Sequence, residues 1–234
     1  MSHVRALVAR KDMALTRNVI DRLVVGFRTD VVRAETLYGR IALSGATRNG
    51  TGAFSPLLQP DKRDAAQFIF FEVAAQFEHF CSEAFLIEVR HEFGVQPQRA
   101  MHVMGSSDRG LSGVMGWGAP KMLQGRARNL YGKRGFFARL ETRLGQTHYQ
   151  RLGYAHKIRN RIAHSGGNAS KDFNAILGNL GVPVGSRKGL SVGRLLMDYP
   201  NGTNANDRWF FRLTGAYRTL VDDFEQYFHA AIPP

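Results

Sequence analysis

The segment 61–93 carries the longest helical pattern in the chain. Proline precedes it at position 60 and glycine follows it at position 94, and both residues commonly flank helices. Its apolar residues recur at spacings of three and four, which places them in one stripe on a helix face. The stripe consists of Phe70, Val73, Phe77, Phe80, Ala84 and Ile87. A helix with such a stripe buries it against other elements, so we expect the stripe to lie in the core.

The same spacing predicts helices along most of the chain. We expect them over residues 4–27, 31–43, 121–131, 136–144, 148–165, 171–181 and 207–231. The last of these has a stripe of its own, made of Phe210, Leu213, Tyr217, Leu220, Phe224 and Phe228. Stretches rich in turn-forming residues at 44–60, 105–120 and 182–194 are predicted loops. We therefore expect an all-α helical bundle with long glycine-rich connections. Residues 1–60 would be an N-terminal helical extension, and residues 61–234 one compact helical domain.

The charge of the chain indicates a polyanionic partner. The 234 residues carry a formal net charge of +13, and 25 arginines outnumber 7 lysines. Guanidinium groups suit paired hydrogen bonds to phosphate better than ammonium groups do. Eleven basic residues and one acidic residue lie between positions 119 and 161. This region is the predicted phosphate-binding part, and a basic surface that only aids solubility is the alternative. Aromatic residues are interleaved there, and we expect most of them in the core.

Cysteine content and hydropathy restrict the expected disulfide bonds, membrane association and localisation of the protein. Cys81 is the single cysteine, which excludes an internal disulfide and a thiolate metal cluster. Its apolar neighbours predict a buried, inert thiol. No apolar run approaches the ~20 residues of a membrane span, and the N-terminus lacks the apolar core of a secretory signal. We expect a cytoplasmic protein without a membrane partner, although the arginine-bearing N-terminus also suits a transit peptide.

The segment 157–167, KIRNRIAHSGG, combines the residues needed for phosphate chemistry without a metal. Arg159 is followed directly by Asn160, and His164 comes shortly before paired glycines that we expect to end a helix. Histidine can exchange protons at neutral pH. Arginine stays protonated and can hold two phosphoryl oxygens as negative charge builds. These side chains suffice to cleave RNA by attack of its own 2′-OH, with no cofactor.

The spacing of arginine, four residues and histidine occurs three times. It also joins Arg143 to His148 and Arg151 to His156, but there a leucine follows the arginine and a glycine lies between the pair. Only the third match has a polar residue after the arginine, so we favour it over a chance helix end. On a helix with ~100° per residue, Arg159 lies about 140° from His164. Two-fold pairing of two copies could bring both side chains to one cleft.

In these residues the chain resembles the HEPN superfamily, whose all-helical domains act on nucleotides and RNA. The hallmark of that family is an arginine, four to six residues and a histidine, often with asparagine after the arginine. The sequence IRNRIAHSG resembles the corresponding motif of the HEPN ribonucleases of toxin–antitoxin and phage-defence systems. The resemblance covers about residues 61–228. It implies a metal-independent endoribonuclease in which Arg159 and His164 carry catalysis and Asn160 orients His164 or the substrate. It also implies a homodimer with a composite site, tRNA or mRNA as target, and an antitoxin or regulatory partner.

Four further residues are candidates for contacts to RNA. Lys157, Arg161, His156 and Arg151 lie around the motif, and a solvated helix face is the alternative. A metal shared by His156 and His164 is rejected, because eight residues rise ~12 Å along a helix. Two other functions stay open at this point. One is a non-catalytic RNA-binding module of HEPN type, and the other is a structural or DNA-binding basic helical protein.

Overall fold

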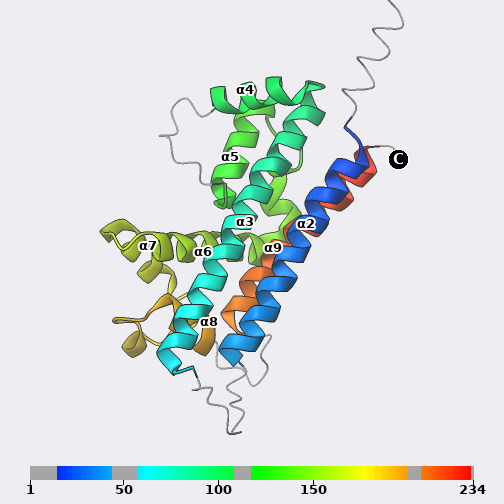
Figure 1. Cartoon of the computed structure of the whole chain (residues 1–234). Helices are drawn as coiled ribbons and strands as arrows, with labels where there is room; N and C mark the ends of the chain where they lie inside the picture. The colour runs from blue at the N-terminus through cyan, green and yellow to red at the C-terminus, as the bar shows by residue number, and fades with distance from the viewer. Residues whose placement is uncertain (1–14, 44–56, 108–116, 200–206, 233–234) are drawn as a thin grey trace, which may run out of the picture. The chain divides into compact units, whose positions relative to one another are not determined.

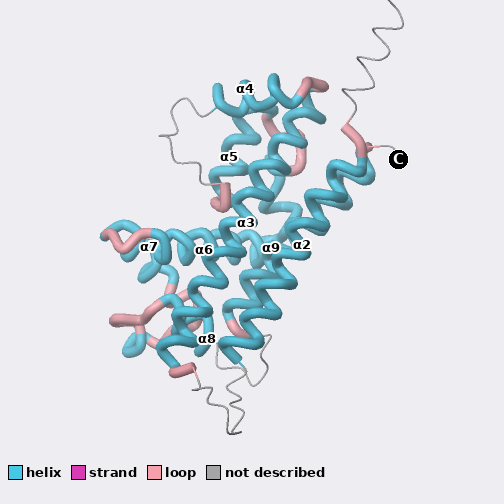
Figure 2. The backbone as a smooth tube through the Cα atoms, in the orientation of Figure 1, coloured by secondary structure: helices cyan, strands magenta, loops and turns pink. Residues whose placement is uncertain are grey.

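The computed structural model describes residues 15–43, 57–107, 117–199 and 207–232, and this part of the chain contains helices and no strand (Figures 1 and 2). The α-helices are α2 (Arg17–Tyr38), α3 (Gln59–Phe93), α4 (Pro97–Ser107), α5 (Pro120–Tyr131), α6 (Leu140–Ala163), α7 (Gly167–Ile176), α8 (Val192–Asp198) and α9 (Trp209–Ala231). Shorter turns of π or 3₁₀ helix are η1 (Gly39–Leu43), η2 (Phe137–Arg139) and η3 (Val184–Ser186). The prediction of an all-α fold is confirmed.

The two long helices α3 and α9 are those that the spacing of apolar residues predicted. All six residues of the predicted stripe on α3 are buried, and so are all six of the stripe on α9. The predicted helix over 121–131 corresponds to α5, and that over 171–181 overlaps α7. The predicted helices over 136–144 and 148–165 correspond to η2 and α6. Within α6 the backbone of Gly145 has a φ of 70°, which interrupts the helix between the two predicted segments.

Other predictions of element boundaries are wrong. α2 continues through residues 28–30, where a gap was expected, because this Arg-Thr-Asp stretch contains no glycine or proline. α4 was not predicted and extends into the loop expected from residue 105. Gly166 has a φ of −67° and precedes α7, so it does not end α6 in a left-handed conformation. The loop expected over 182–194 contains the start of α8, whose N–H of Arg194 donates to Ser191 Oγ.

The remaining predictions of local structure fall on other parts of the chain. Residues 4–14 of the first expected helix, and 44–56 and 108–116 of the expected loops, lie outside the described residues. Of the described helices, none is long and apolar enough to cross a membrane.

The chain divides into two compact units that are interleaved in the sequence. The first unit comprises Met1–Phe27, Glu78–Tyr149 and Thr219–Pro234, and the second comprises Arg28–Phe77 and Gln150–Arg218. Neither unit is one continuous segment, and α2, α3, α6 and α9 each contribute residues to both. The predicted boundary near residue 60 stays a prediction.

A buried carboxylate organises the first unit. Glu88 on α3 is fully buried, and its carboxylate accepts hydrogen bonds from the Tyr131 hydroxyl and from the backbone N–H groups of Phe136 and Phe137. Gly135 has a φ of 81°, and a Cβ there would overlap the Glu88 carboxylate. Tyr131, Phe136 and Phe137 are buried, which confirms that these aromatic residues of the basic region belong to the core. Cys81 is also completely buried, as predicted, and burial raises the pKa of its thiol.

Stacked aromatic rings form the core of the second unit. Tyr38 stacks on Phe210 with ring centroids 4.0 Å apart, and Phe77 stacks on Tyr217 at the same separation. The Tyr38 hydroxyl donates to the carbonyl of Leu196 at 2.9 Å, which ties α2 to α8. The segment 157–167 lies in this unit.

Candidate active site

The part of α6 after Gly145 presents the motif to solvent on one side. Leu152, Ala155 and Ile158 are buried at spacings of three, so one face of this helix lies in the core of the second unit. Arg159 and Asn160 follow directly on Ile158 and are partly exposed. The helical pattern therefore turns the polar residues of the motif away from the core.

Asn160 links two neighbours in a short hydrogen-bonded chain. Arg159 Nη1 donates to Asn160 Oδ1 at 3.3 Å, and Asn160 Nδ2 lies 3.0 Å from His156 Nε2. With the amide oxygen taken by the guanidinium, the amide nitrogen faces the ring as a donor, so Nε2 of His156 is the acceptor. This network assigns the Nδ1–H tautomer to a neutral His156. The structure thus brings together Arg159, Asn160 and His156.

The environment of His156 favours its neutral form. Burial lowers its pKa, the neighbouring Arg159 and Lys157 lower it further, and Asp172 partly offsets them. A neutral ring at neutral pH agrees with its role as acceptor for Asn160. The predicted pairing of Asn160 with His164 stays a prediction, because the Asn160 amide contacts His156 and Arg159 here.

Arg159 is positioned by an aromatic ring as well as by Asn160. Its guanidinium lies 5.4 Å from the centroid of the Phe71 ring on α3, within the range of a cation–π contact. Sequence reasoning did not identify Phe71, because no local pattern shows which face of α3 meets α6. The planar guanidinium is therefore held at a defined place on the surface of the second unit.

His164 follows the last residue of α6 and is exposed. Its N–H donates to the carbonyl of Asn160 at 2.9 Å, and its carbonyl accepts from Arg161 Nη1 at 3.3 Å. Arginine side chains commonly bind carbonyls at the end of a helix in this way. Both contacts fix the backbone of His164, and the residue as a whole is exposed.

The predicted RNA-binding residues lie in different surroundings. Lys157, His156, Arg161 and Arg151 are all partly exposed. Burial and the cation of Arg212 lower the pKa of Arg151, and Arg212 itself pairs with Asp207 at 3.8 Å.

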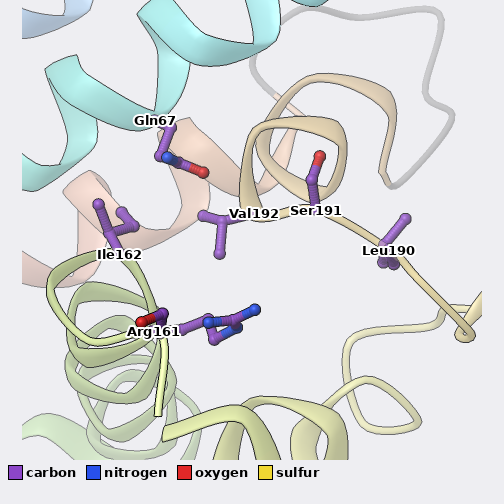
Figure 3. A pocket seen from close by; sticks show the side chains of 7 residues that line it. Gln67, Arg161, Ile162, Leu190, Ser191 and Val192 are labelled. Carbon is purple, nitrogen blue, oxygen red and sulfur yellow. The ribbon is translucent and has the colours of Figure 1, made fainter.

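A cavity of about 230 Å³ lies beside the end of α6 (Figure 3). Side chains from α3, from the end of α6 and from the start of α8 surround it. They are Gln67, Arg161, Ile162, Ser165, Leu190, Ser191 and Val192. Sequence reasoning found only Arg161 among them. Ser191 is a serine at a helix start, and this signal was available in the sequence.

One group of side chains has the composition of a metal site, and it belongs to the first unit. Ligand atoms of Asp21, Glu225 and His229 all lie within 4.8 Å of one another, and His229 Nε2 is 2.7 Å from Asp21 Oδ1. The His229 ring and the Asp21 carboxylate are thus within hydrogen-bonding distance of each other. The group is not part of the 157–167 motif. It escaped the sequence analysis because Asp21 is remote in sequence from the other two residues.

Comparison of the chain with protein-family models, with curated proteins and with solved structures finds no match.

Proposed function

We propose that the protein is a metal-independent endoribonuclease, with Arg159 and His164 as its catalytic residues. The observation that carries the proposal is the pair of side chains at the end of α6. A guanidinium that contacts Phe71 and Asn160 is followed five residues later by an exposed histidine, just beyond the last residue of the helix. The net charge of +13 supports a polyanionic substrate.

The chemistry follows from these two side chains. The 2′-OH of RNA attacks the adjacent phosphorus, the bond to the 5′-oxygen breaks, and a 2′,3′-cyclic phosphate forms. The 2′-OH gives up its proton as it attacks, and the 5′-oxygen takes up a proton as it leaves. His164 transfers one of these two protons and water transfers the other. Arg159 stabilises the negative charge that develops on the phosphoryl oxygens. Lys157, Arg151 and Arg161 would hold the flanking backbone phosphates.

The arrangement of the motif supports a dimeric enzyme. Arg159 contacts Phe71 and Asn160, whereas His164 is an exposed residue beyond the helix end. A composite site would combine Arg159 of one copy with His164 of a second copy. An antitoxin or another regulatory protein would then control the dimer, as expected for a toxin or defence effector acting on tRNA or mRNA.

The test is cleavage of RNA in EDTA by the wild type, His164→Ala and Arg159→Lys, with analysis of the product ends. We expect EDTA-resistant cleavage that leaves 2′,3′-cyclic phosphate. Loss of a general acid–base group lowers the rate by about 10²–10⁴-fold, so His164→Ala should be nearly inactive. Arg159→Lys keeps the positive charge but loses the planar guanidinium with its paired N–H donors, so its cleavage rate should also be strongly reduced. The control is His79→Ala, which removes an exposed histidine of α3 outside the motif.

The same experiment separates the second candidate function. If the wild type binds RNA and does not cut it, and if His164→Ala binds equally well, the protein is an RNA-binding module. If duplex DNA is bound as tightly as RNA at every salt concentration, the ribonuclease proposal fails.

A further inference from the structure

The cavity at the end of α6 has the lining of a site for a small organic anion. Among the described residues that line it, Arg161 is the one cation and none is a carboxylate. Gln67, Ser165 and Ser191 add groups that donate and accept hydrogen bonds, and Ile162, Leu190 and Val192 supply apolar surface. Apolar walls with a few convergent polar groups are typical of ligand sites.

The size of the cavity limits the ligand. Its volume of about 230 Å³ is below the roughly 300–1,000 Å³ of sites that take drug-sized ligands. The cavity therefore suits a ligand with one planar ring system, such as a single nucleobase, better than a ligand with two separate ring systems. Figure 3 shows the amide of Gln67 and the guanidinium of Arg161 directed toward the space that Val192 borders. A ring held there would have a hydrogen-bonding group on one side and a cation on another.

The cavity adjoins the proposed catalytic residues in two ways. Arg161 lines the cavity and also donates to the backbone carbonyl of His164 at 3.3 Å. Gln67 lies one helical turn along α3 from Phe71, the residue whose ring holds Arg159. The cavity thus shares Arg161 with the backbone of His164, and its Gln67 wall lies on the same helix as the ring that contacts Arg159.

The wall that α8 provides is fixed by close packing. A Cβ at Gly193 would overlap the backbone carbonyl of Arg63 on α3, so the two backbones are in direct contact there. Arg63 Nη2 also forms an ion pair with Asp198 Oδ2 at 3.0 Å, near the other end of α8. The cavity between α3 and α8 is therefore already formed, which lowers the cost of binding a ligand.

We propose that this cavity binds one nucleotide of single-stranded RNA and thereby selects the base beside the cleaved bond. This inference rests on the proposed function. The base packs against Val192 and Ile162. The Gln67 amide forms hydrogen bonds to the edge of the base, with its N–H as donor and its carbonyl oxygen as acceptor. The phosphate of the same nucleotide binds Arg161. Ser191 Oγ accepts from the N–H of Arg194 at 3.2 Å, and its hydroxyl proton donates to the ligand.

The first test measures binding without any cleavage. The full-length protein is titrated with 5′-AMP, 5′-GMP, 5′-CMP, 5′-UMP and inorganic phosphate, with calorimetry for affinity and NMR for the Gln67 side-chain amide. We expect one nucleotide to bind more tightly than the other three and than phosphate, and to shift the Gln67 signal. Gln67→Leu and Arg161→Gln should each weaken that binding by about tenfold or more. The matched controls are Gln59→Leu, at the exposed start of α3, and Lys171→Gln, an exposed cation of α7.

The second test uses RNA that carries each base in turn beside one cleavable bond. We expect Gln67→Leu to reduce the base preference of cleavage and Gln59→Leu to leave it unchanged. Nucleotide binding that is absent, or that both cavity variants leave unaltered, overturns the inference even if RNA is cut. If the nucleotides bind as expected and RNA is not cut, the nucleotide site stands and the ribonuclease proposal fails. Equal binding of phosphate and all four nucleotides would show that the cavity does not read a base.

Discussion

Replacing Glu88 by glutamine should remove a large pH dependence of stability. Burial raises the pKa of the Glu88 carboxyl to about 8, and this outweighs the hydrogen bonds from Tyr131, Phe137 and Phe136, which lower it. Between its ordinary value of 4.5 and about 8, the folded chain therefore holds a proton that the unfolded chain has lost. The contribution of Glu88 to stability is complete below pH 4.5 and is lost as the pH rises toward 8.

The size of this effect follows from the same interval. Each pH unit between the two pKa values changes the free energy of unfolding by about 1.4 kcal/mol, so the full interval amounts to roughly 5 kcal/mol as an upper bound. A glutamine has nearly the same shape and carries no titrating proton. Its amide oxygen can still accept from the N–H groups of Phe136 and Phe137. Glu88→Gln should therefore gain stability relative to the wild type as the pH rises.

The assay is urea unfolding of both proteins between pH 5.5 and 8, followed by circular dichroism and by fluorescence of Trp117 and Trp209. The expected result is a difference in unfolding free energy that grows in favour of Glu88→Gln by up to about 1.4 kcal/mol per pH unit. Tyr131→Phe is the companion variant. It removes a hydrogen bond that lowers the pKa of Glu88, so it should extend the loss of stability to higher pH. A difference that is flat, or that favours the wild type at higher pH, would refute the reasoning, because Glu88 would then be ionised in the folded chain.

Three further predictions concern packing, assembly and RNA. Gly193→Ala should unfold at lower urea than the wild type because its Cβ meets the backbone of Arg63, whereas Gly153→Ala, in open space on α6, should gain roughly 0.5–1 kcal/mol; equal unfolding midpoints would contradict this contact. Mixing inactive Arg159→Ala with inactive His164→Ala should restore roughly a quarter of wild-type cleavage if dimers exchange freely and each site is composite; no recovery after exchange would place both residues in one copy. The affinity for single-stranded RNA should fall with salt, with a slope of log affinity against log salt of about −0.7 per phosphate contacted; a flat salt response would argue against binding through the basic residues.

Long-range regularity is the part of this fold that the sequence predicts well. The stripes of α3 and α9 were predicted because six apolar residues in each follow one helical period, and burial of such a stripe dominates the position of a helix. His156 and Asn160 are four residues apart, a spacing that brings side chains together on one helix face, and Asn160 Nδ2 lies 3.0 Å from His156 Nε2. Helix ends were predicted less closely. α6 ends at Ala163, just before the paired glycines as expected, but Gly166 has a φ of −67° and precedes α7 instead of capping α6 in a left-handed conformation. A glycine permits several backbone conformations, so its presence alone does not determine which one is adopted.

The surroundings of the site depend on contacts between elements that are distant in sequence. Phe71 contacts Arg159, and Gln67 and Val192 border the cavity. None of these three residues belongs to the segment 157–167. Each is an ordinary residue of an amphipathic helix when it is considered by itself. Their importance arises from the packing of α3 and α8 around the end of α6, and no local spacing rule encodes that packing.

His156 and His164, the two histidines near the Arg159 motif, have different environments. This difference indicates different roles for them in a catalytic site. His156 is partly buried, its pKa is lowered by burial and by Arg159, and Asn160 donates to its ring. His164 is exposed beyond the helix end, with its backbone fixed by Asn160 and Arg161. A neutral histidine bound to the network that holds Arg159 suits a positioning role, whereas an exposed ring can reach a phosphate of another molecule. A rigid arginine on one copy and a projecting histidine on a second are thus complementary, which is the physical reason to expect activity from two copies and none from one.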